Sequence, residues 1–403
     1  MEKQLILLSL LFNPSQEESY LQRVTQKQER LPSAPNNFQL NLIKGLYENN
    51  QKNVKIINSL PFGSYPKHFD RLFFKQKEWT YSGYRCLDIP CINLPILKQI
   101  QKKNNLIRIF KQVIHDKDEI LIYSAHWPYL SAVCAIKKQK KIKATLIIAD
   151  LPEYYDYKRV DIIRRLLRKA NNFLINKCMK KIDRFILLTE QMKEKIPIQG
   201  KPYIVLEGIA PQLSEHCKPC YHKNNQNEIF FYSGSLSLCF GIKNLVDAFL
   251  DIDNDNLELW ICGKGEATDY ILKKSKEDKR IHYFGYVTTE RNNELRSKAT
   301  LLVNPRTPEG EFSKYSFPSK IMEYFSSGIP VIMYKLDGIP DEYTPFFYSI
   351  KGNTPLDIKN SLENVLRINP TERELIAKKA FDFVRINKNP KTQAQKIIHF
   401  LFS

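Results

Sequence analysis

Short apolar runs alternate along this chain with amphipathic stretches, and this rhythm limits the folds open to it more than any other feature. The runs have the length of strands and are rich in Ile, Leu, Val and Phe, whereas the stretches between them place apolar residues at helical spacing. Such alternation is typical of βαβ units, in which buried parallel strands lie between layers of helices. The sequence therefore predicts an α/β protein with doubly wound parallel sheets.

The predicted strands form two groups along the chain. In the first half we expect strands at Leu5–Phe12, Val54–Asn58, Glu119–Tyr123, Ala144–Ala149, Arg184–Leu188 and Tyr203–Leu206. In the second half we expect strands at Ile229–Ser233, Leu257–Cys262, Ile281–Phe284, Thr300–Val303 and Pro330–Met333. The polar stretch 214–227 lies between the two groups. Two doubly wound domains would then face each other across a cleft at the carboxyl ends of both sheets.

The composition indicates the cellular compartment of the protein and the kinds of ligand that it attracts. No run of about 18 apolar residues occurs, so no membrane-spanning helix is expected, and Leu5–Phe12 lacks the small-residue cleavage site of a signal peptide. The formal charge of +19 attracts polyanions, which include nucleic acid, an anionic bilayer and phosphorylated substrates. The scattered cysteines fit a reducing cytoplasm. Cys217 and Cys220 form a C-x-x-C motif without a second ligand pair, so we expect a polar linker there rather than a zinc site.

A helix expected over residues 160–181 is strongly basic. Its apolar stripe consists of Ile163, Leu166, Leu167, Ala170, Leu174 and Cys178. Its basic residues include Arg164, Arg165, Arg168 and Lys169. The stripe alone fits a core helix with a charged back, but such a back normally mixes charges of both signs. A polybasic amphipathic helix suits docking on an anionic membrane surface, so both interpretations stay open. Nucleic-acid binding is disfavoured, because no aromatic residues interleave with the charge in the manner of a base-stacking platform.

The densest chemical signal lies in residues 302–332. A strand there ends before a loop that holds Arg306, and a helix is expected from about Ser319 to Ser327. The free N–H groups at the helix start, together with the charge of Lys320, suit a diphosphate. Glu323 lies one turn later on the same face, where its carboxylate can accept hydrogen bonds from both hydroxyls of a ribose.

This segment resembles the donor-binding signature of the retaining GT-B glycosyltransferases of family 4, the group 1 glycosyltransferases, and especially a branch found in bacterial surface-polysaccharide gene clusters. The matching residues are Ser316, Phe317, Pro318, Ser319, Lys320, Glu323 and the run Gly328-Ile329-Pro330-Val331. The resemblance implies that Ser316–Ser319 and Glu323 bind the donor, and that Lys320 and Arg306 stabilise the leaving diphosphate. The first Glu of the signature falls on Tyr315, which leaves open whether Glu309 or Glu311 takes over its contact to the transferred sugar.

Other stretches follow the same family in the expected order. Further donor-binding residues implied by the resemblance are Gly234 and Ser235 after the first strand, Gly263 and Lys264 in a G-x-G turn, and Tyr286 and Val287 in the nucleobase loop. Relatives often carry Arg and Lys in the first of these loops, where this chain has Ser235 and Phe240. We therefore expect Arg306, Lys320 and Lys264 to supply the charge that holds the diphosphate.

Two catalytic candidates lie in the first half. Asp150 follows a buried strand and resembles the acceptor-side loop of the family, where a carboxylate approaches the acceptor hydroxyl; a carboxylate that caps a turn explains the residue equally well. His126 follows another predicted strand. A lone histidine is more often structural, so this residue is the weaker candidate.

The resemblance implies a GT-B fold of two Rossmann-like domains facing a central cleft. We expect an acceptor-side domain over residues 1–208, a nucleotide-sugar domain over 209–388, and a C-terminal helix over 389–403 that packs back toward the first domain. The implied activity is that of a metal-independent, retaining hexosyltransferase, which moves sugar from a UDP-sugar to a lipid-linked saccharide in capsule, exopolysaccharide or O-antigen biosynthesis. No cofactor is implied, because the nucleotide sugar is a substrate.

The expected partners are the nucleotide-sugar donor, the lipid-linked saccharide acceptor and an anionic membrane surface, but no nucleic acid. The expected location is the cytoplasm, at the inner face of the cell membrane. Two alternatives stay open: a nucleotide-sugar epimerase of the same fold, and a non-catalytic basic protein that binds a membrane or nucleic acid.

Overall fold

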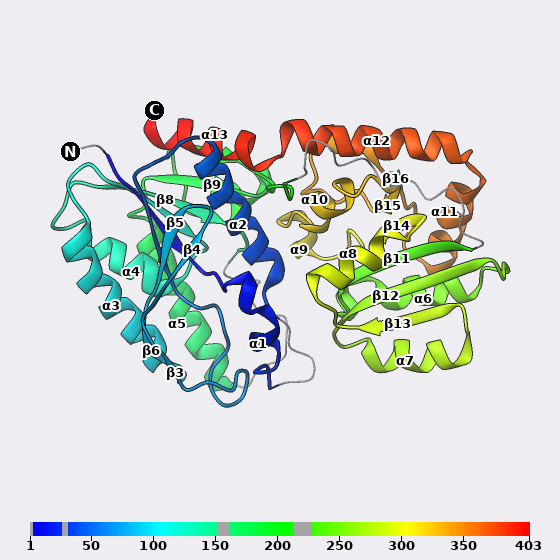
Figure 1. The fold of residues 1–403 in the computed structure, drawn as a ribbon, viewed down its shortest axis with the longest axis horizontal. Coiled ribbons are helices and arrows are strands. Elements are labelled where there is room, and N and C mark those ends of the chain that lie inside the picture. Colours follow the sequence, from blue (N-terminus) through cyan, green and yellow to red (C-terminus); the bar gives the residue numbers. More distant parts are fainter. Residues whose placement is uncertain (1–2, 26–30, 152–161, 213–226) are drawn as a thin grey trace.

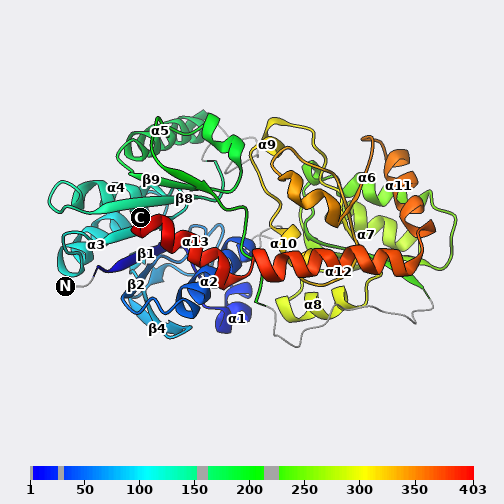
Figure 2. The same ribbon diagram turned by 90° about the horizontal axis from the view of Figure 1, so that it is seen from above.

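The computed structural model describes residues 3–25, 31–151, 162–212 and 227–403, which form two α/β lobes side by side (Figure 1). The chain enters the second lobe after β10 (Tyr203–Val205) and returns through α12 (Pro370–Asn387) and α13 (Pro390–Phe402). The C-terminal end of the chain therefore lies on the first lobe, on the same side of the molecule as the N-terminal end (Figures 1 and 2).

An eight-stranded sheet forms the centre of the first lobe, in the order β10-β9-β8-β7-β1-β2-β5-β4. All neighbouring strands are parallel except β4 and β5, which pair antiparallel at one edge. Its other strands are β1 (Leu5–Ser9), β2 (Val54–Asn58), β4 (Lys77–Tyr81), β5 (Tyr84–Asp88), β7 (Glu119–Tyr123), β8 (Lys143–Ile148) and β9 (Arg184–Leu187). A separate antiparallel pair consists of β3 (Phe73–Phe74) and β6 (Cys91–Ile92).

Helices cover both faces of this sheet, because successive residues of a strand point to opposite faces. Ile6 and Leu8 pack in one core cluster with residues of α3, α4 and α5, whereas Leu5 and Leu7 pack in another with residues of α2 and α13. The helices of this lobe are α1 (Glu17–Leu21), α2 (Ser33–Glu48), α3 (Leu97–Val113), α4 (Trp127–Ile136) and α5 (Ile162–Met179). Burial on both faces explains why the central strands are continuous apolar runs in the sequence.

A six-stranded parallel sheet forms the second lobe, in the order β13-β12-β11-β14-β15-β16. Its strands are β11 (Glu228–Ser235), β12 (Leu257–Lys264), β13 (Ile281–Gly285), β14 (Leu301–Asn304), β15 (Val331–Met333) and β16 (Tyr348–Ser349). Its helices are α6 (Ile242–Leu250), α7 (Thr268–Glu277), α8 (Thr289–Ser297), α9 (Glu311–Lys314), α10 (Lys320–Phe325) and α11 (Pro355–Arg367).

The α/β class and the doubly wound parallel sheets expected from the sequence are confirmed. Helix α3 was not predicted, because the four residues that it buries, at spacings of four, include Lys98 and Lys102 besides Leu106 and Phe110. The hairpin of β4 and β5 was also missed, since it interleaves buried residues with exposed charges. Helix α10 is shorter than the expected span 319–327.

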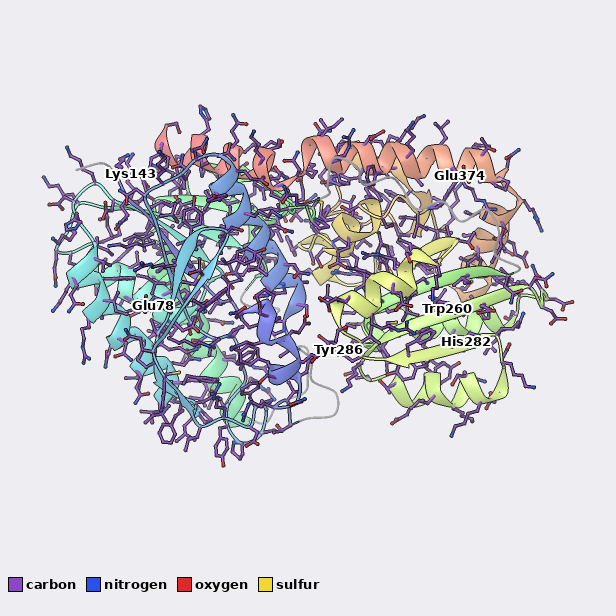
Figure 3. The ribbon with its side chains drawn as sticks, viewed as in Figure 1. Glu78, Lys143, Trp260, His282, Tyr286 and Glu374 are labelled. Atoms are coloured by element: carbon purple, nitrogen blue, oxygen red, sulfur yellow. The ribbon has the colours of Figure 1, made fainter. Side chains whose placement is uncertain are left out.

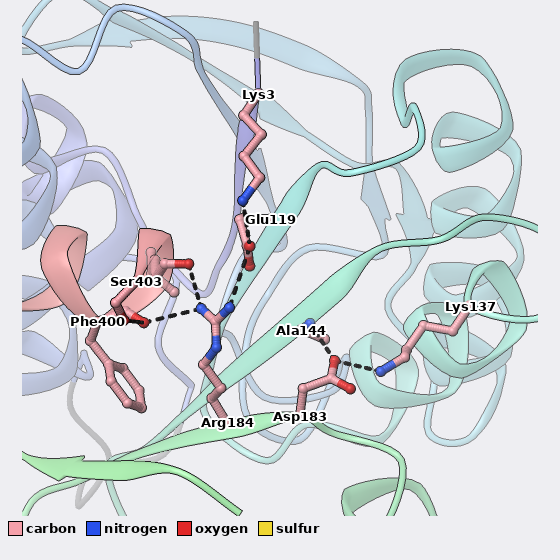
Figure 4. A network of polar contacts seen from close by, with 9 residues as sticks. Lys3, Glu119, Lys137, Ala144, Asp183, Arg184, Phe400 and Ser403 are labelled. Atoms are coloured by element: carbon pink, nitrogen blue, oxygen red, sulfur yellow. Dashed lines mark hydrogen bonds and ion pairs between the residues drawn. The ribbon is translucent and has the colours of Figure 1, made fainter.

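A buried arginine anchors α13 to the first lobe (Figure 4). Arg184 of β9 donates hydrogen bonds from Nη1 to the carbonyl oxygens of Phe400, at 3.1 Å, and Leu401 in the last turn of α13. Its Nη2 lies 3.5 Å from Oε1 of Glu119, which Lys3 Nζ approaches to 3.4 Å. The guanidinium thus neutralises a buried carboxylate and satisfies carbonyl groups that a helix end leaves unpaired.

We predict that Arg184→Met lowers the free energy of unfolding by about 3 kcal/mol, because among the described residues Glu119 is then left buried with the half-exposed Lys3 as its one remaining cation. Urea denaturation followed by circular dichroism measures this loss. The double variant Arg184→Met/Glu119→Gln should recover part of it, whereas strictly additive losses would show that the two side chains do not interact.

Candidate functional site

Asp150 and Arg306 come from different lobes and interact electrostatically across the boundary between them. Asp150 lies just beyond β8 and Arg306 just beyond β14, so each occupies the carboxyl end of a parallel strand. The guanidinium is close enough to Asp150 to lower the pKa of its carboxyl group. The carboxyl ends of the two sheets are therefore brought together, in the position where doubly wound proteins bind ligands.

The carboxyl group of Asp150 is strongly perturbed. Desolvation by the surrounding protein raises its pKa to about 6, against the opposing effect of Arg306. The residue nevertheless keeps an exposed surface. Crowding by protein together with access to solvent is expected of a side chain in a recess, and that crowding raises the pKa because it removes part of the water that would hydrate the carboxylate. A carboxylate that titrates near neutral pH suits proton transfer.

An aromatic ring holds Arg306 in place. Its guanidinium carbon lies 5.2 Å from the ring centroid of Phe240, a distance at which cation and ring attract each other. Gly241, next along the chain, has a φ of 73°, and a Cβ there would lie 2.1 Å from the carbonyl oxygen of Pro305. Glycine therefore lets the loop with Phe240 pack directly on the loop with Arg306.

Lys320 reaches from the start of α10 to the end of β11. Its Nζ lies 5.4 Å from the ring centroid of Tyr232. A Cβ on Gly234 would lie 2.0 Å from this Nζ, and Gly234 has a φ of 151°. Only a residue without a side chain leaves room for the ammonium group there. A positive charge thus lies over the carboxyl end of a central strand.

The neighbouring strand ends in a second glycine. Gly263 is in register with Gly234, and a Cβ on Gly263 would lie 1.8 Å from the carbonyl oxygen of Gly234. Ser235 and Lys264 form the next pair in register, and both are half-buried. These four residues, all expected from the sequence to bind the donor, thus lie side by side at the carboxyl ends of β11 and β12, and Gly234 lies next to Lys320.

The segment before α10 divides into a buried and an exposed part. Ser316, Phe317 and Pro318 are buried, and the Phe317 ring packs 5.4 Å from that of Tyr343. Ser319 is exposed. The start of α10 therefore reaches solvent at Ser319, whereas the side chain of Phe317 contributes to the core of the second lobe.

Glu323 lies one turn into α10 and faces α8. Its Oε2 is 3.9 Å from Nη1 of Arg296, and 32% of the Glu323 side chain is exposed. Arg296 was missed by the sequence analysis, because an arginine in the last turn of a polar helix is an ordinary stabilising residue. Arg296 comes next to Glu323 only through the tertiary packing of α8 against α10.

The loop after β13 touches the first lobe. Figure 3 shows Tyr286 at the boundary between the lobes, and its hydroxyl oxygen lies 3.3 Å from Oγ of Ser33 at the start of α2. Val287 packs against the core of the second lobe. Tyr286 therefore borders the region between the lobes at a place distinct from the contact made by Tyr315.

Tyr315, which replaces the first Glu of the signature, joins the two lobes. Its hydroxyl donates a hydrogen bond to Oε2 of Glu194 at 3.0 Å, and its ring is buried in a core cluster of the first lobe. Lys195 Nζ lies 2.6 Å from Oε1 of Glu311 in the same contact. Of the two carboxylates considered as replacements, Glu311 is therefore engaged between the lobes, and Glu309 is exposed.

His126 precedes α4 and follows β7, the strand next to β8. Its Nδ1 is buried and has no hydrogen-bond partner among the described residues. Desolvation, reinforced by Lys102 and Lys98, lowers the pKa of His126 well below its ordinary value. The imidazole is therefore neutral near pH 7.

The basic helix α5 presents apolar side chains to solvent. The exposed ones are Leu166 (61%), Leu167 (51%), Phe173 (68%) and Leu174 (40%). The interpretation of this stripe as core-facing is therefore wrong for Leu166, Leu167 and Leu174. Arg165 and Lys169 are exposed on the same helix, Arg168 is half-buried, and the side chain of Arg164 lies outside what the structure describes.

The described residues contain neither a cluster typical of a metal site nor a helix able to span a membrane. In the described part of the chain, no three His, Cys, Asp or Glu side chains cluster as metal ligands do. The Cys217–Cys220 motif lies outside the described residues. No helix within the described ranges has both the length and the apolar character needed to cross a bilayer.

We predict that Asp150→Asn stabilises the protein at pH 7.5 and not at pH 4. The native carboxyl has a pKa of about 6 and the unfolded one a pKa of about 3.9, so the native state binds more protons between these values and loses stability as pH rises through them. An amide removes that loss. Thermal unfolding at both pH values tests this, with Asp70→Asn on the exposed surface as control; equal effects of the two changes would contradict the desolvation of Asp150.

Part of the chain matches a known protein family, and its fold is similar to several solved structures. Residues 218–381 match the family model described as glycosyl transferases group 1. No curated protein matches the chain in sequence. Among solved structures, the chain is similar to the lipopolysaccharide outer core galactosyltransferase WaaB, with a TM-score of 0.60 and 14% identity over 100% of this chain and 99% of that one. It is also similar to sucrose-phosphate synthase from Thermosynechococcus elongatus, with a TM-score of 0.64 and 12% identity over 99% and 98%.

A third similar structure is that of a TarM mutant from S. aureus in complex with fondaparinux, alpha-GlcNAc-glycerol and UDP. The TM-score is 0.53 and the identity 14%, over 78% of this chain, which spans only 60% of the length of that protein. The two-domain GT-B fold expected from the resemblance is thus confirmed. The chain combines this fold with a C-terminal region that matches the group 1 glycosyl transferases.

Proposed function

We propose that this protein is a glycosyltransferase that moves a sugar from a nucleotide-sugar donor to a lipid-linked saccharide acceptor. The family-model match and the GT-B fold support glycosyl transfer in general. The observation that carries the proposal is the convergence of Lys320 and Arg306 on one side, and Asp150 on the other, at the facing carboxyl ends of two sheets.

The two cations support a diphosphate site on the second lobe. Where relatives carry Arg and Lys in the loop after the first strand, this chain has Ser235 and Phe240. Arg306 lies over the ring of Phe240, and Lys320 lies over Gly234 just before Ser235. In our proposal these two cations, supplied by the loop after β14 and by the first residue of α10, bind the diphosphate in place of the missing pair.

The proposed reaction depends on electrostatic stabilisation. The bond between the anomeric carbon and the diphosphate breaks, and Lys320 and Arg306 stabilise the charge on the leaving group. The acceptor hydroxyl forms the new bond from the same face, which retains the anomeric configuration and requires no metal ion. Its proton passes to a phosphate oxygen or to Asp150, whose raised pKa suits a proton acceptor.

The nucleoside would lie between α10 and the loop after β13. Glu323 would accept hydrogen bonds from the ribose hydroxyls, with Arg296 holding the carboxylate in position. The backbone at Tyr286 and Val287 would contact the base. We propose uridine as the nucleoside, and the UDP bound in the similar TarM structure supports this choice.

Helix α5 supports action at a membrane surface, in surface-polysaccharide synthesis. Three large apolar side chains, Leu166, Leu167 and Phe173, are more than half exposed beside Arg165 and Lys169. Exposed apolar residues flanked by cations are the pattern of a helix that lies in the interface of an anionic bilayer. Docking through α5 would bring the first lobe to the inner face of the membrane, where a lipid-linked acceptor is found.

Thermal stabilisation by a panel of nucleotide sugars, followed by acceptor-dependent transfer, tests the proposed activity. A nucleotide-sugar epimerase would convert the donor without any acceptor. A protein that binds neither UDP nor UDP-sugars would be a non-catalytic member of the fold, and the proposal would fail.

We predict that Gly234→Ala weakens UDP binding about tenfold and leaves uridine binding unchanged, because the new Cβ displaces the Lys320 ammonium from the diphosphate side. Glu323→Ala should weaken both ligands, since both contain the ribose. Isothermal titration calorimetry measures these affinities. Gly200→Ala is the matched control, because Gly200 also has a positive φ, of 75°, but no atom within 4 Å of its Cβ position. Unchanged UDP affinity in Gly234→Ala would exclude this role for Lys320.

We predict that Arg165→Gln/Lys169→Gln lowers binding to phosphatidylglycerol vesicles tenfold or more, since each cation near an anionic surface contributes about 1 kcal/mol. Vesicle co-sedimentation at low salt measures the change. Lys273→Gln/Lys276→Gln, on the exposed surface of α7, removes the same charge from another helix and should have little effect. If both pairs reduce binding equally, net charge alone causes the association and α5 is not the docking site.

A further inference from the structure

Helix α3 buries two lysines on the same face. Lys98 and Lys102 are one turn apart, and 9% and 5% of their surfaces are exposed. Lysines are almost never buried in this way without a charged partner, because an ammonium ion removed from water loses a large hydration energy. The proposed reaction uses neither residue, so their burial needs another explanation.

The partners of both lysines are neutral. Lys98 Nζ donates to the carbonyl oxygen of Phe62 at 3.1 Å and to Oδ1 of Asn93 at 3.3 Å. Lys102 Nζ donates to the carbonyl oxygen of Leu60 at 3.3 Å. An ammonium group has three N–H donors. Within the described residues, one donor of Lys98 and two of Lys102 are therefore left for a ligand.

The titratable groups around these lysines do not supply a negative charge. Across the described ranges, Lys102 and the thiol of Cys91, on β6, act on Lys98, and the same thiol acts on Lys102. Burial raises the pKa of Cys91, so the thiol is neutral near pH 7. Burial and Lys102 together lower the pKa of Lys98 to about 8. Two adjacent buried lysines thus lie in the first lobe, and no carboxylate among the described residues compensates their charge.

His126 adds a further polar atom to the same place. Its Nδ1 is buried and lacks a hydrogen-bond partner in the described structure, and Lys102 and Lys98 both act on its pKa. A neutral imidazole with hydrogen on Nδ1 can donate to an anion. The two lysines of α3 and His126, just before α4, therefore offer four donors.

The cluster lies at the point where ligands bind in open α/β sheets. From β1 the chain turns to β2 on one side and later to β7 on the other, so the order of strands reverses between β1 and β7. Leu60 and Phe62 follow β2, and His126 follows β7. The cluster is thus at the carboxyl ends of the strands, at their topological switch point.

We propose that Lys98, Lys102 and His126 bind a phosphate group of the acceptor. The inference rests on the proposed transferase activity and specifies its acceptor as a phosphorylated one. Four donors match the terminal oxygens of a phosphate better than the two oxygens of a carboxylate. His126 and Asp150 follow neighbouring strands, which lie about 5 Å apart. The phosphate and the reacting hydroxyl would therefore be separated by about one sugar residue.

The test is a titration of the full chain with inorganic phosphate in the presence of saturating UDP, which occupies the donor site. We expect phosphate to raise the melting temperature of the wild type at pH 7. Lys102→Met should weaken phosphate binding about tenfold, whereas Lys111→Met, on the exposed surface of α3, should leave it unchanged. Affinity should fall between pH 7 and pH 9, as Lys98 loses its proton, although phosphate itself becomes more negative.

Transfer assays then separate acceptor phosphate from free phosphate. Lys102→Met should raise the KM for a phosphate-bearing acceptor and leave UDP binding intact. If wild-type phosphate binding is absent, or equal in Lys102→Met and Lys111→Met, the phosphate site is wrong while the transferase proposal stands. If UDP does not bind, the transferase proposal fails independently. Should Lys102→Met not fold, the wild-type titration and its dependence on pH decide the question.

Discussion

The relative position of the two lobes is the constraint on which the site depends, because Asp150 and Arg306 belong to different lobes. Lys388, between α12 and α13, is central to it: its buried Nζ lies 2.9 Å from Oε2 of Glu207 and 2.8 Å from Oε1 of Glu342. The ammonium group of Lys388 thereby links the segment after β10, which leads into the second lobe, to the segment between α12 and α13, which leads back to the first. Breaking these ion pairs would leave a buried charge unpaired, which is costly. The two segments of chain that pass between the lobes, referred to below as the crossing point, are therefore held together.

The contacts farther from the crossing point are of a different kind. Glu194 and Glu311, which pair with Lys314 and Lys195, have roughly half their side chains exposed. Exposed ion pairs contribute about 0–1 kcal/mol each. These ion pairs therefore add little to the contact, and the burial of the Tyr315 ring in the core of the first lobe is what holds the two lobes together there.

The fold was predictable because its signal is local: apolar runs and their spacing report parallel strands without knowledge of distant contacts. The segment around Lys320 was recognisable for the same reason, since its residues are adjacent in sequence. Contacts between distant segments could not be predicted from the sequence. The position of Arg296 beside Glu323, the stacking of Arg306 on Phe240 and the burial of Tyr315 in the other lobe all depend on tertiary packing. Helix α3 was missed because its buried face includes lysines.

The close approach of Lys320 to Gly234 also bears on how the sequence can change over time. Any side chain at position 234 would occupy the space of the ammonium group, and the backbone conformation there also disfavours one. Neither residue can therefore vary alone without moving a charge. Among related chains, a residue other than glycine at position 234 should accompany a change at position 320, although the two positions are 86 apart in the sequence.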